Sequence, residues 1–205
     1  MSAEIKPLTP ETTADFFDFF DNRAFTDHQE WSFCYCTYMH TGEKETREID
    51  EKIEAGGNND EAARRVFRET AAGFIENGEL RGYLAYEDGV AVGWVNANDK
   101  AVFKKFDHSA AVTDFIRRNN IDGRTKSVVC FTTAPECRGK GIAAALLDRV
   151  VADARAEGYA AVEGYAFRRD TREPFDYTGP LGLFEKAGFA VASEENGKAV
   201  MRLMI

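Results

Sequence analysis

Residues 125–166 read TKSVVCFTTAPECRGKGIAAALLDRVVADARAEGYAAVEGYA, and this stretch decides the fold. Its β-branched and apolar start predicts a strand over residues 125–132. A segment with helical spacing follows over residues 142–157 and ends at Gly158, and a second strand is expected over residues 160–166. The stretch therefore predicts a β-turn-α-β unit, in which a helix separates two strands of one sheet.

The turn between the first strand and the helix carries the most informative residues. Arg138, Gly141 and Ala143 fit the pattern R-x-x-G-x-A. At the start of a helix several backbone N–H groups converge, and the helix dipole favours an anion there. Glycine and a small residue one turn later let phosphate oxygens approach the backbone. The pattern predicts a pyrophosphate-binding loop, and the alternative is an ordinary glycine turn.

Other phosphate motifs are excluded by spacing. Lys140 precedes Gly141 and is not followed by Ser or Thr, so the loop is not G-x-x-x-x-G-K-[ST]. A G-x-G-x-x-G motif after a first strand is also missing from the sequence. A nucleotide hydrolase and a dinucleotide-dependent dehydrogenase are therefore disfavoured.

A second motif lies downstream at the expected distance, where residues 183–189 read LFEKAGF. Together with the R-G-x-G-I-A loop, its helix and the two strands, it makes residues 128–189 resemble the GNAT superfamily of acyl-CoA-dependent N-acyltransferases. The resemblance implies an α/β fold with a central mixed, mostly antiparallel sheet that is flanked by helices. Its two parallel central strands are expected to splay apart.

The resemblance also implies how acetyl-CoA, as a cosubstrate, binds. The pantetheine arm would enter between the splayed strands, where backbone groups of Phe131 and Thr133 would pair with its amides. The residues expected to hold the pyrophosphate are Arg138, Gly139, Lys140, Gly141, Ile142 and Ala143.

One departure from the family pattern affects the mechanism. Members of the family often have a tyrosine where this chain has Phe184, and that tyrosine commonly protonates the departing CoA thiolate. Phe184 has no proton to donate. Tyr177 lies seven residues earlier, where the family often has an asparagine, and it is our candidate for the missing general acid. The alternative role of Tyr177 is packing.

The whole chain, residues 1–205, is interpreted as one acyltransferase domain. Residues 1–80 would supply N-terminal helices and acceptor-site elements, and residues 81–205 the acetyl-CoA-binding core. Asp88 and Gly89 between two apolar runs predict a hairpin. The remaining expected elements are helices over 10–20, 46–75 with a break at 56–57, 109–118 and 181–187, hairpin strands over 81–87 and 90–97, and strands over 189–193 and 199–205.

An aromatic tract over residues 31–38 alternates as a strand or an extended loop would. Its W-x-x-C-x-C pattern resembles a tract in some uncharacterised members of the superfamily, which implies an acceptor pocket. The residues that would line that pocket are Trp31, Phe33, Cys34, Tyr35 and Cys36. Aromatic packing with small buried cysteines is the alternative.

Composition and charge limit the kinds of molecule that the protein is expected to bind. Among 205 residues, 26 are Lys or Arg and 35 are Asp or Glu, which gives a formal net charge of −9 and disfavours binding to nucleic acid. Cys34 and Cys36 with His28 and His40 lack the paired C-x-x-C spacing of zinc sites, so we expect no metal. No run of eighteen apolar residues occurs, and a cytoplasmic protein without membrane contact is expected. A homodimer is left open.

The function predicted from these observations is direct transfer of an acetyl group from acetyl-CoA to a primary amine of a small molecule or peptide. A base or a water chain must deliver the free amine, and Glu163, Asp99 and Asp176 are the carboxylates considered. The alternative is a noncatalytic module that binds or senses acyl-CoA, because Phe184 replaces the usual acid.

Overall fold

The computed structural model describes residues 3–106, 115, 121–168 and 177–205. Within this part of the chain, seven strands form one sheet in the order β1-β2-β3-β4-β5-β7-β6. The strands are β1 (Glu4–Pro7), β2 (Gly82–Glu87), β3 (Val90–Asp99), β4 (Thr125–Thr133), β5 (Ala161–Phe167), β6 (Ala190–Glu195) and β7 (Lys198–Met204). The α-helices are α1 (Thr13–Asn22), α2 (Glu43–Ala55), α3 (Asp60–Glu76), α5 (Ile142–Ala156) and α6 (Leu181–Lys186).

The pairing of the strands confirms the predicted mixed sheet. β4 and β5 are parallel, and every other neighbouring pair is antiparallel. The β2–β3 hairpin turns at Asp88 and Gly89, whose φ angles are +50° and +77°. Two successive positive φ angles are the requirement of the tight turn that matches the twist of a hairpin, so this local prediction is confirmed.

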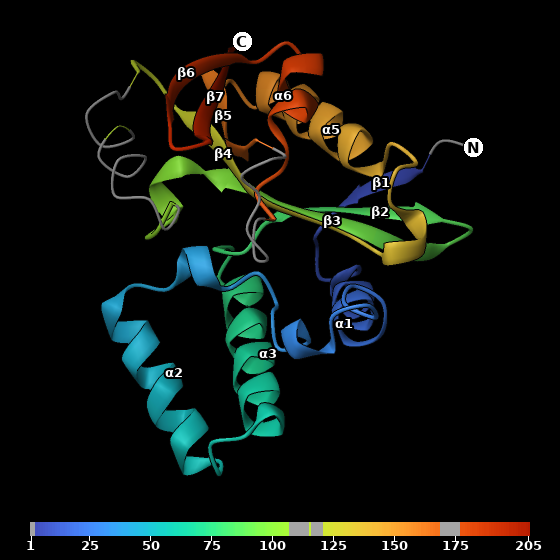
Figure 1. Cartoon of the computed structure of the whole chain (residues 1–205), viewed down its shortest axis with the longest axis vertical. Helices are drawn as coiled ribbons and strands as arrows, with labels where there is room; N and C mark the ends of the chain where they lie inside the picture. Colours follow the sequence, from blue (N-terminus) through green and yellow to red (C-terminus); the bar gives the residue numbers. More distant parts are fainter. Residues whose placement is uncertain (1–2, 107–114, 116–120, 169–176) are drawn as a thin grey trace.

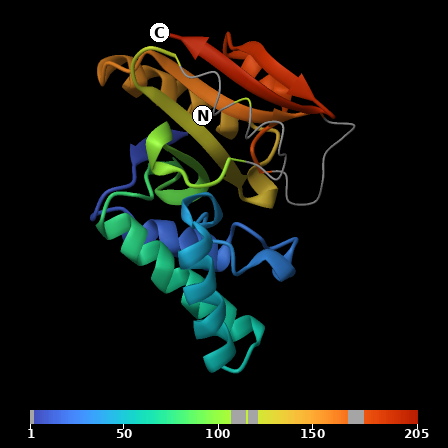
Figure 2. The ribbon, with the colours of Figure 1, turned by 90° about the vertical axis from the view of Figure 1, so that its left-hand side faces the viewer.

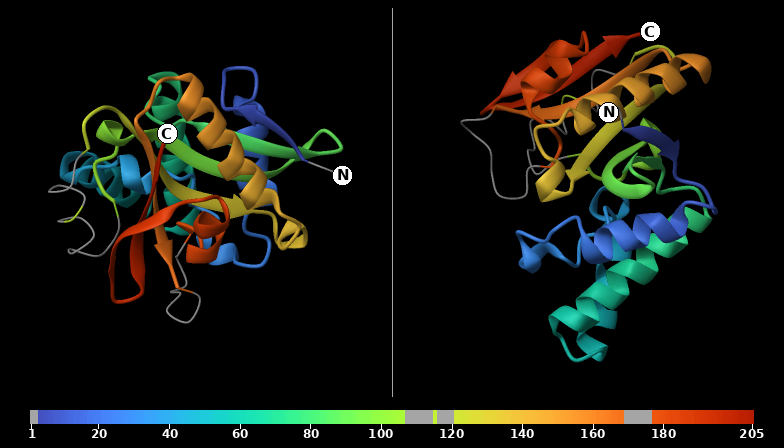
Figure 3. Two further views of the ribbon diagram at one scale, coloured as in Figure 1. Left: turned by 90° about the horizontal axis from the view of Figure 1, so that it is seen from above. Right: turned by 90° about the vertical axis from the view of Figure 1, so that its right-hand side faces the viewer.

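Helices cover both faces of the sheet (Figure 1). α5 and α6 lie on one face, and α1 and α3 lie on the other, with α2 packed beside α3 away from the strands. Figure 2 shows the three N-terminal helices together below the sheet. Figure 3 shows α5 across the central strands, which it contacts along β2, β3 and β4.

Close packing holds α5 and α1 on the sheet. A Cβ atom at Gly93 of β3 would lie 2.6 Å from Cγ2 of Ile142, so α5 fits here only because position 93 is glycine. On the other face Phe16 of α1 meets Trp94 edge to face at 4.9 Å between ring centroids. Both aromatic side chains are fully buried, and burial of this kind stabilises the fold by about 2 kcal/mol per side chain.

Several predicted boundaries are corrected. Of the two alternatives for residues 31–38, the strand is wrong: residues 32–37 form an irregular loop between two short 3₁₀ helices, η1 (Gln29–Trp31) and η2 (Tyr38–His40). Two helices replace the single interrupted pattern over 46–75, as expected, but the first begins earlier, at Glu43. The helix expected over 109–118 lies outside the described residues, apart from residue 115. Among the described residues, no helix is long and apolar enough to span a membrane.

A buried histidine gives the fold a measurable acid sensitivity. Asn96 Nδ2 donates to Nε2 of His40 at 3.0 Å, and the His40 ring packs on Phe103 at 4.9 Å. His40 is fully buried, and this burial lowers its pKa to about 4, from an ordinary value of 6.5. The unfolded chain therefore binds more protons than the folded chain between pH 6.5 and 4, so stability falls as pH falls through this window.

We expect the free energy of unfolding to fall by about 2 kcal/mol more in the wild type than in His40→Gln when pH drops from 7 to 5. Urea unfolding of both proteins at the two pH values measures the difference. Because every other titrating group is common to both proteins, their contributions cancel to first order. Equal losses in the two proteins would show that His40 is not the source of the sensitivity.

Candidate functional site

The two parallel central strands, β4 and β5, separate about halfway along their length. The ladder between β4 and β5 extends only from Thr125–Ala161 to Val128–Gly164. On its other side β4 carries a bulge, because Ala97 of β3 pairs with Val128 and the adjacent Asn96 pairs with Cys130. A bulge bends a strand and increases its twist, so β4 turns away from β5 beyond Val128. The predicted separation of the two strands is therefore present, and the region between their separated ends is called the splay below.

The aromatic ring of Phe184 closes the floor of this splay. A Cβ atom at Gly164 of β5 would lie 2.1 Å from Cε1 of Phe184, so glycine is required there for the ring to fit. The Phe184 ring also meets Phe131 at 6.0 Å and Phe189 at 5.4 Å, and it is fully buried. The floor is thus built of carbon atoms and offers no proton donor at this position.

The backbone of β4 within the splay bonds to a downstream segment. Phe131 N–H donates to the carbonyl oxygen of Tyr177 at 2.6 Å, and Phe167 N–H donates to the carbonyl oxygen of Gly179 at 3.1 Å. Residues 177–179 therefore lie between the ends of the separated strands, and the Phe131 N–H that was expected to face pantetheine is occupied by Tyr177.

The loop before α5 has the geometry of an anion-binding loop. Gly139 and Gly141 have φ angles of +76° and +86°, and a Cβ atom on either would meet nothing within 4 Å. Glycine is therefore required by conformation rather than by crowding. The first intrahelical bond runs from Ala145 N–H to the carbonyl of Gly141. The N–H groups of residues 142–144, which precede it, are left to bind an acceptor from outside the helix.

The basic side chains of this loop are directed elsewhere. Arg138 forms two contacts with the carboxylate of Asp27, at 2.5 and 3.3 Å, and donates from Nε to the carbonyl of Thr133 at 3.3 Å. The hydrogen bond from Arg138 lowers the pKa of Asp27. Lys140 is exposed, with Nζ 4.0 Å from Sγ of Cys137. Arg138 thus ties the loop to the segment after α1, and no sequence motif had singled out Asp27.

An aromatic cluster stands over the splay. The half-buried Tyr177 ring meets Phe25 at 5.8 Å and Trp31 at 5.7 Å, each edge to face, and His28 stacks on Trp31 at 3.8 Å. The cluster joins the N-terminal segment to the segment that bonds to Phe131. Tyr177 and Trp31, predicted as general acid and acceptor-site residue from separate motifs, are therefore neighbours.

The other residues of the aromatic tract divide between two environments. Tyr35 is fully buried, and its hydroxyl donates to Asp21 at 2.5 Å, so it serves helix packing. Phe33 packs on Phe67 of α3 at 5.6 Å. Cys34 is half-buried and Cys36 is buried. Both lie near the central strands β3 and β4.

The carboxylates considered as bases are placed differently. Glu163 is 1% exposed, and its two oxygens bind Arg202 at 2.6 Å and Lys100 at 3.0 Å. Asp99 binds Arg124 at 3.1 Å and pairs with Lys126 near the start of β4, at the end of the strand remote from Phe131. Asp176 lies outside the described residues. Glu163 is held as an ion-pair anchor, and Asp99 lies away from the splay.

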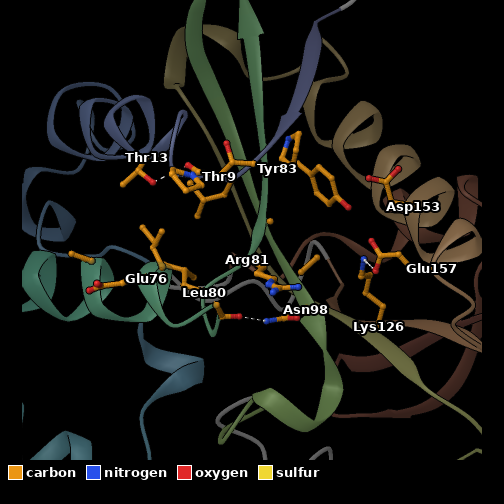
Figure 4. A pocket seen from close by; sticks show the side chains of 18 of the residues that line it. Thr9, Thr13, Glu76, Leu80, Arg81, Tyr83, Asn98, Lys126, Asp153 and Glu157 are labelled. Carbon is orange, nitrogen blue, oxygen red and sulfur yellow. Dashed lines mark hydrogen bonds and ion pairs between the residues drawn. The ribbon is translucent and has the colours of Figure 1, made fainter.

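The structure also contains a cavity of about 740 Å³, and no residue of the loop lines it (Figure 4). Its lining includes Asp153 and Glu157 from the carboxyl end of α5, whereas the loop precedes the amino end of the same helix. Within this lining Lys126 binds the neighbouring Glu157 at 2.8 Å. The cavity is thus near the start of β4, whereas the splay lies beyond Val128, and the two are separate. Among the described residues, no group of three or more His, Cys, Asp or Glu side chains could hold a metal ion.

Comparisons with known proteins agree with this geometry. A sequence profile described as "Acetyltransferase (GNAT) family" matches residues 10–189. No curated protein sequence matches the chain. Solved structures with a similar fold include the PaiA N-acetyltransferase of Thermoplasma acidophilum in complex with coenzyme A, at 14% identity, a TM-score of 0.51 and full coverage of both chains.

Two further structures share the fold. The GNAT domain of PAT from S. lividans is 14% identical with a TM-score of 0.54, over 99% of this chain and 90% of that one. A histone acetyltransferase HPA2 and related acetyltransferase from Corynebacterium glutamicum is 15% identical with a TM-score of 0.52, over 98% and 96%. At these identities the likeness concerns the fold alone.

Proposed function

The chain belongs to the GNAT acetyltransferase family, and on this premise we propose that it transfers an acetyl group from acetyl-CoA directly to a primary amine of a small molecule or peptide. The observation that carries the proposal is the pair of left-handed glycines, Gly139 and Gly141, at the start of α5 beside the splay. The structural relative from Thermoplasma acidophilum is a complex with coenzyme A, which supports an acyl-CoA donor.

In this proposal the donor is held mainly by backbone. The N–H groups at the start of α5 bind the pyrophosphate, and the backbone of Phe131 and Thr133 pairs with pantetheine. The Phe131 N–H now bonds to the Tyr177 carbonyl, so pantetheine would replace that bond. Arg138 acts by fixing the loop through Asp27, and Lys140 contributes a nearby positive charge.

The acceptor amine would reach the thioester beside the aromatic cluster, near Trp31 and Cys34. An alkylammonium group has a pKa of about 10.4, so the amine must lose a proton before it attacks. Because Glu163 is bound by two cations and Asp99 lies at the remote end of β4, an ordered water is the base that we favour. Tyr177 would then protonate the departing thiolate, which Phe184 cannot do.

In this direct transfer all atoms and protons are accounted for, and no acyl-enzyme intermediate forms. The amine nitrogen attacks the thioester carbonyl, the C–N bond forms, and the C–S bond breaks as the thiolate leaves. One proton passes from the amine to the base, and one passes from Tyr177 to sulfur. A chromatographic assay of acetyl-CoA consumption, with amino acids, polyamines, aminoglycosides and peptides as acceptors, tests the proposal. Tight binding of acetyl-CoA without consumption across the panel would instead favour the noncatalytic module.

Direct transfer predicts that no acetyl-cysteine forms during turnover. Burial raises the pKa of Cys34 to about 12, which leaves it a protonated and poor nucleophile. We expect intact mass spectrometry to find no acetyl adduct after the protein is mixed with acetyl-CoA in the absence of an acceptor. An adduct that disappears in Cys130→Ser would overturn direct transfer and establish a two-step route.

A further inference from the structure

Three cysteines from distant parts of the chain gather beside the splay. Cys34 and Cys36 lie in the segment between η1 and η2, and Cys130 lies in β4, next to Phe131. Cys130 and Cys34 each keep a partly exposed surface, whereas Cys36 is buried. The proximity of Cys130 contributes to the raised pKa of Cys34, after the larger contribution of burial. The fourth cysteine, Cys137, lies in the η4 turn (Pro135–Cys137) and contacts Glu87 instead.

A backbone hydrogen bond brings Cys36 close to Cys130 through Asn96. The carbonyl of Cys36 accepts a hydrogen bond from Asn96 Nδ2 at 3.2 Å, and Asn96 is the residue that pairs with Cys130 across β3 and β4. Cys36 also has a φ angle of +57°, a left-handed conformation that non-glycine residues rarely adopt. A strained residue persists only where the surrounding structure holds it, and Asn96 provides that anchor.

The two thiols are unequal. A hydrogen bond with Cys130 raises the pKa of Cys36, and burial raises it further. The same hydrogen bond lowers the pKa of Cys130, and Thr132 Oγ1, 3.7 Å from Cys130 Sγ, adds to the effect. Burial opposes this lowering at Cys130, so the pair is asymmetric, with Cys130 the more acidic of the two thiols. A partly exposed, more acidic thiol beside a second thiol is the arrangement that reacts with oxidants and then resolves to a disulfide.

We propose that Cys36 and Cys130 form an oxidisable thiol pair that a hydroperoxide converts to a disulfide. The Cys130 thiolate attacks one peroxide oxygen, the O–O bond breaks, and a sulfenic acid forms while the alkoxide or hydroxide takes up a proton. The Cys36 sulfur then attacks the sulfenic sulfur, and the S–O bond breaks to release water with the Cys36 proton. The two thiols lose two electrons in total, and the peroxide gains them.

Oxidation would act on β4, the strand that carries Cys130 and Phe131. A disulfide would tether the aromatic tract to β4 at the residue that precedes Phe131, whose N–H faces the splay. A shift of about 1 Å in a positioning group is enough to lower turnover by about 10²-fold. This consequence rests on the proposed function, whereas formation of the disulfide does not.

The first arm of the test is peptide mapping of the full chain. After hydrogen peroxide treatment and alkylation, we expect a peptide pair linked through Cys36 and Cys130 that dithiothreitol separates. The same link should form in Cys34→Ser and in Cys137→Ser. In Cys36→Ser the link is lost and Cys130 should be oxidised to sulfinic acid. A folded wild-type protein that forms no link, or that links Cys34 instead, would overturn the proposal.

The second arm compares the acetyl-transfer rate of each protein before and after oxidation. For the wild type we expect the rate of acetyl transfer to fall by about 10²-fold on oxidation and to return on reduction, while the oxidised-to-reduced ratio of Cys36→Ser stays near one. A disulfide that forms without changing the rate would overturn the regulatory consequence. If no acceptor is ever acetylated, the mapping arm still decides whether the thiol pair exists, so failure of the function and failure of the pair are separable.

Discussion

Replacing Gly141 with valine is expected to abolish the rise in melting temperature that acetyl-CoA gives the wild-type protein. Gly141 has a φ angle of +86°, a conformation that costs a residue with a side chain about 1–2 kcal/mol. Relief of this strain would rotate the peptide units at the start of α5, so that their N–H groups no longer converge on one anion. A ligand at a hundred times its Kd stabilises a protein by about 2.7 kcal/mol, and this stabilisation should disappear.

A matched control separates this effect from general backbone strain. Gly158 follows the other end of α5, has a φ angle of +72°, and also has open space where a Cβ atom would lie. Gly158→Val should therefore lower the stability of the ligand-free protein to a similar extent and retain the acetyl-CoA shift. Differential scanning fluorimetry of both variants checks this. A full shift in Gly141→Val would exclude the loop as the pyrophosphate site.

Removing only the hydroxyl of Tyr177, as Tyr177→Phe, is expected to lower kcat by about 10²–10⁴-fold. The ring packs edge to face on Phe25 and Trp31, and the carbonyl that bonds to Phe131 belongs to the backbone. Neither contact needs the phenol oxygen, so the ring packing and the affinity for acetyl-CoA should be nearly unchanged. The expected signature is a loss in kcat without a loss in donor binding.

Steady-state kinetics on any accepted amine, beside calorimetric binding of acetyl-CoA, measures both quantities. Tyr86→Phe is a suitable control, because the Tyr86 hydroxyl donates to Asp15 of α1 at 2.8 Å and serves packing of that helix. That variant should lose stability but keep kcat. Unimpaired turnover in Tyr177→Phe would instead make water the proton donor and leave Tyr177 a packing residue.

Local patterns predicted the core of the sheet well. The helix expected over residues 142–157 is Ile142–Ala156, and the strand expected over 125–132 is Thr125–Thr133. Both succeed because the signals are contiguous: a β-branched run is followed by glycines and then by apolar residues at helical spacing. The alternation over residues 31–38 did not distinguish a strand from a loop, because its aromatic side chains pack on partners elsewhere in the chain. Tyr35 bonds to Asp21, and Trp31 packs on Tyr177.

The sequence by itself determined the family and the loop that we propose for the donor, because Arg138 to Ala143 lie within six consecutive residues whose conformations follow from glycine and a helix start. Only the tertiary structure decided what surrounds that loop. Arg138 meets Asp27 from 111 residues away, and the Cys36 carbonyl bonds to Asn96 of β3 from 60 residues away. Such contacts depend on how distant segments fold across the splayed strands, and since no local spacing encodes them, they emerge only when the sheet and its helices pack together.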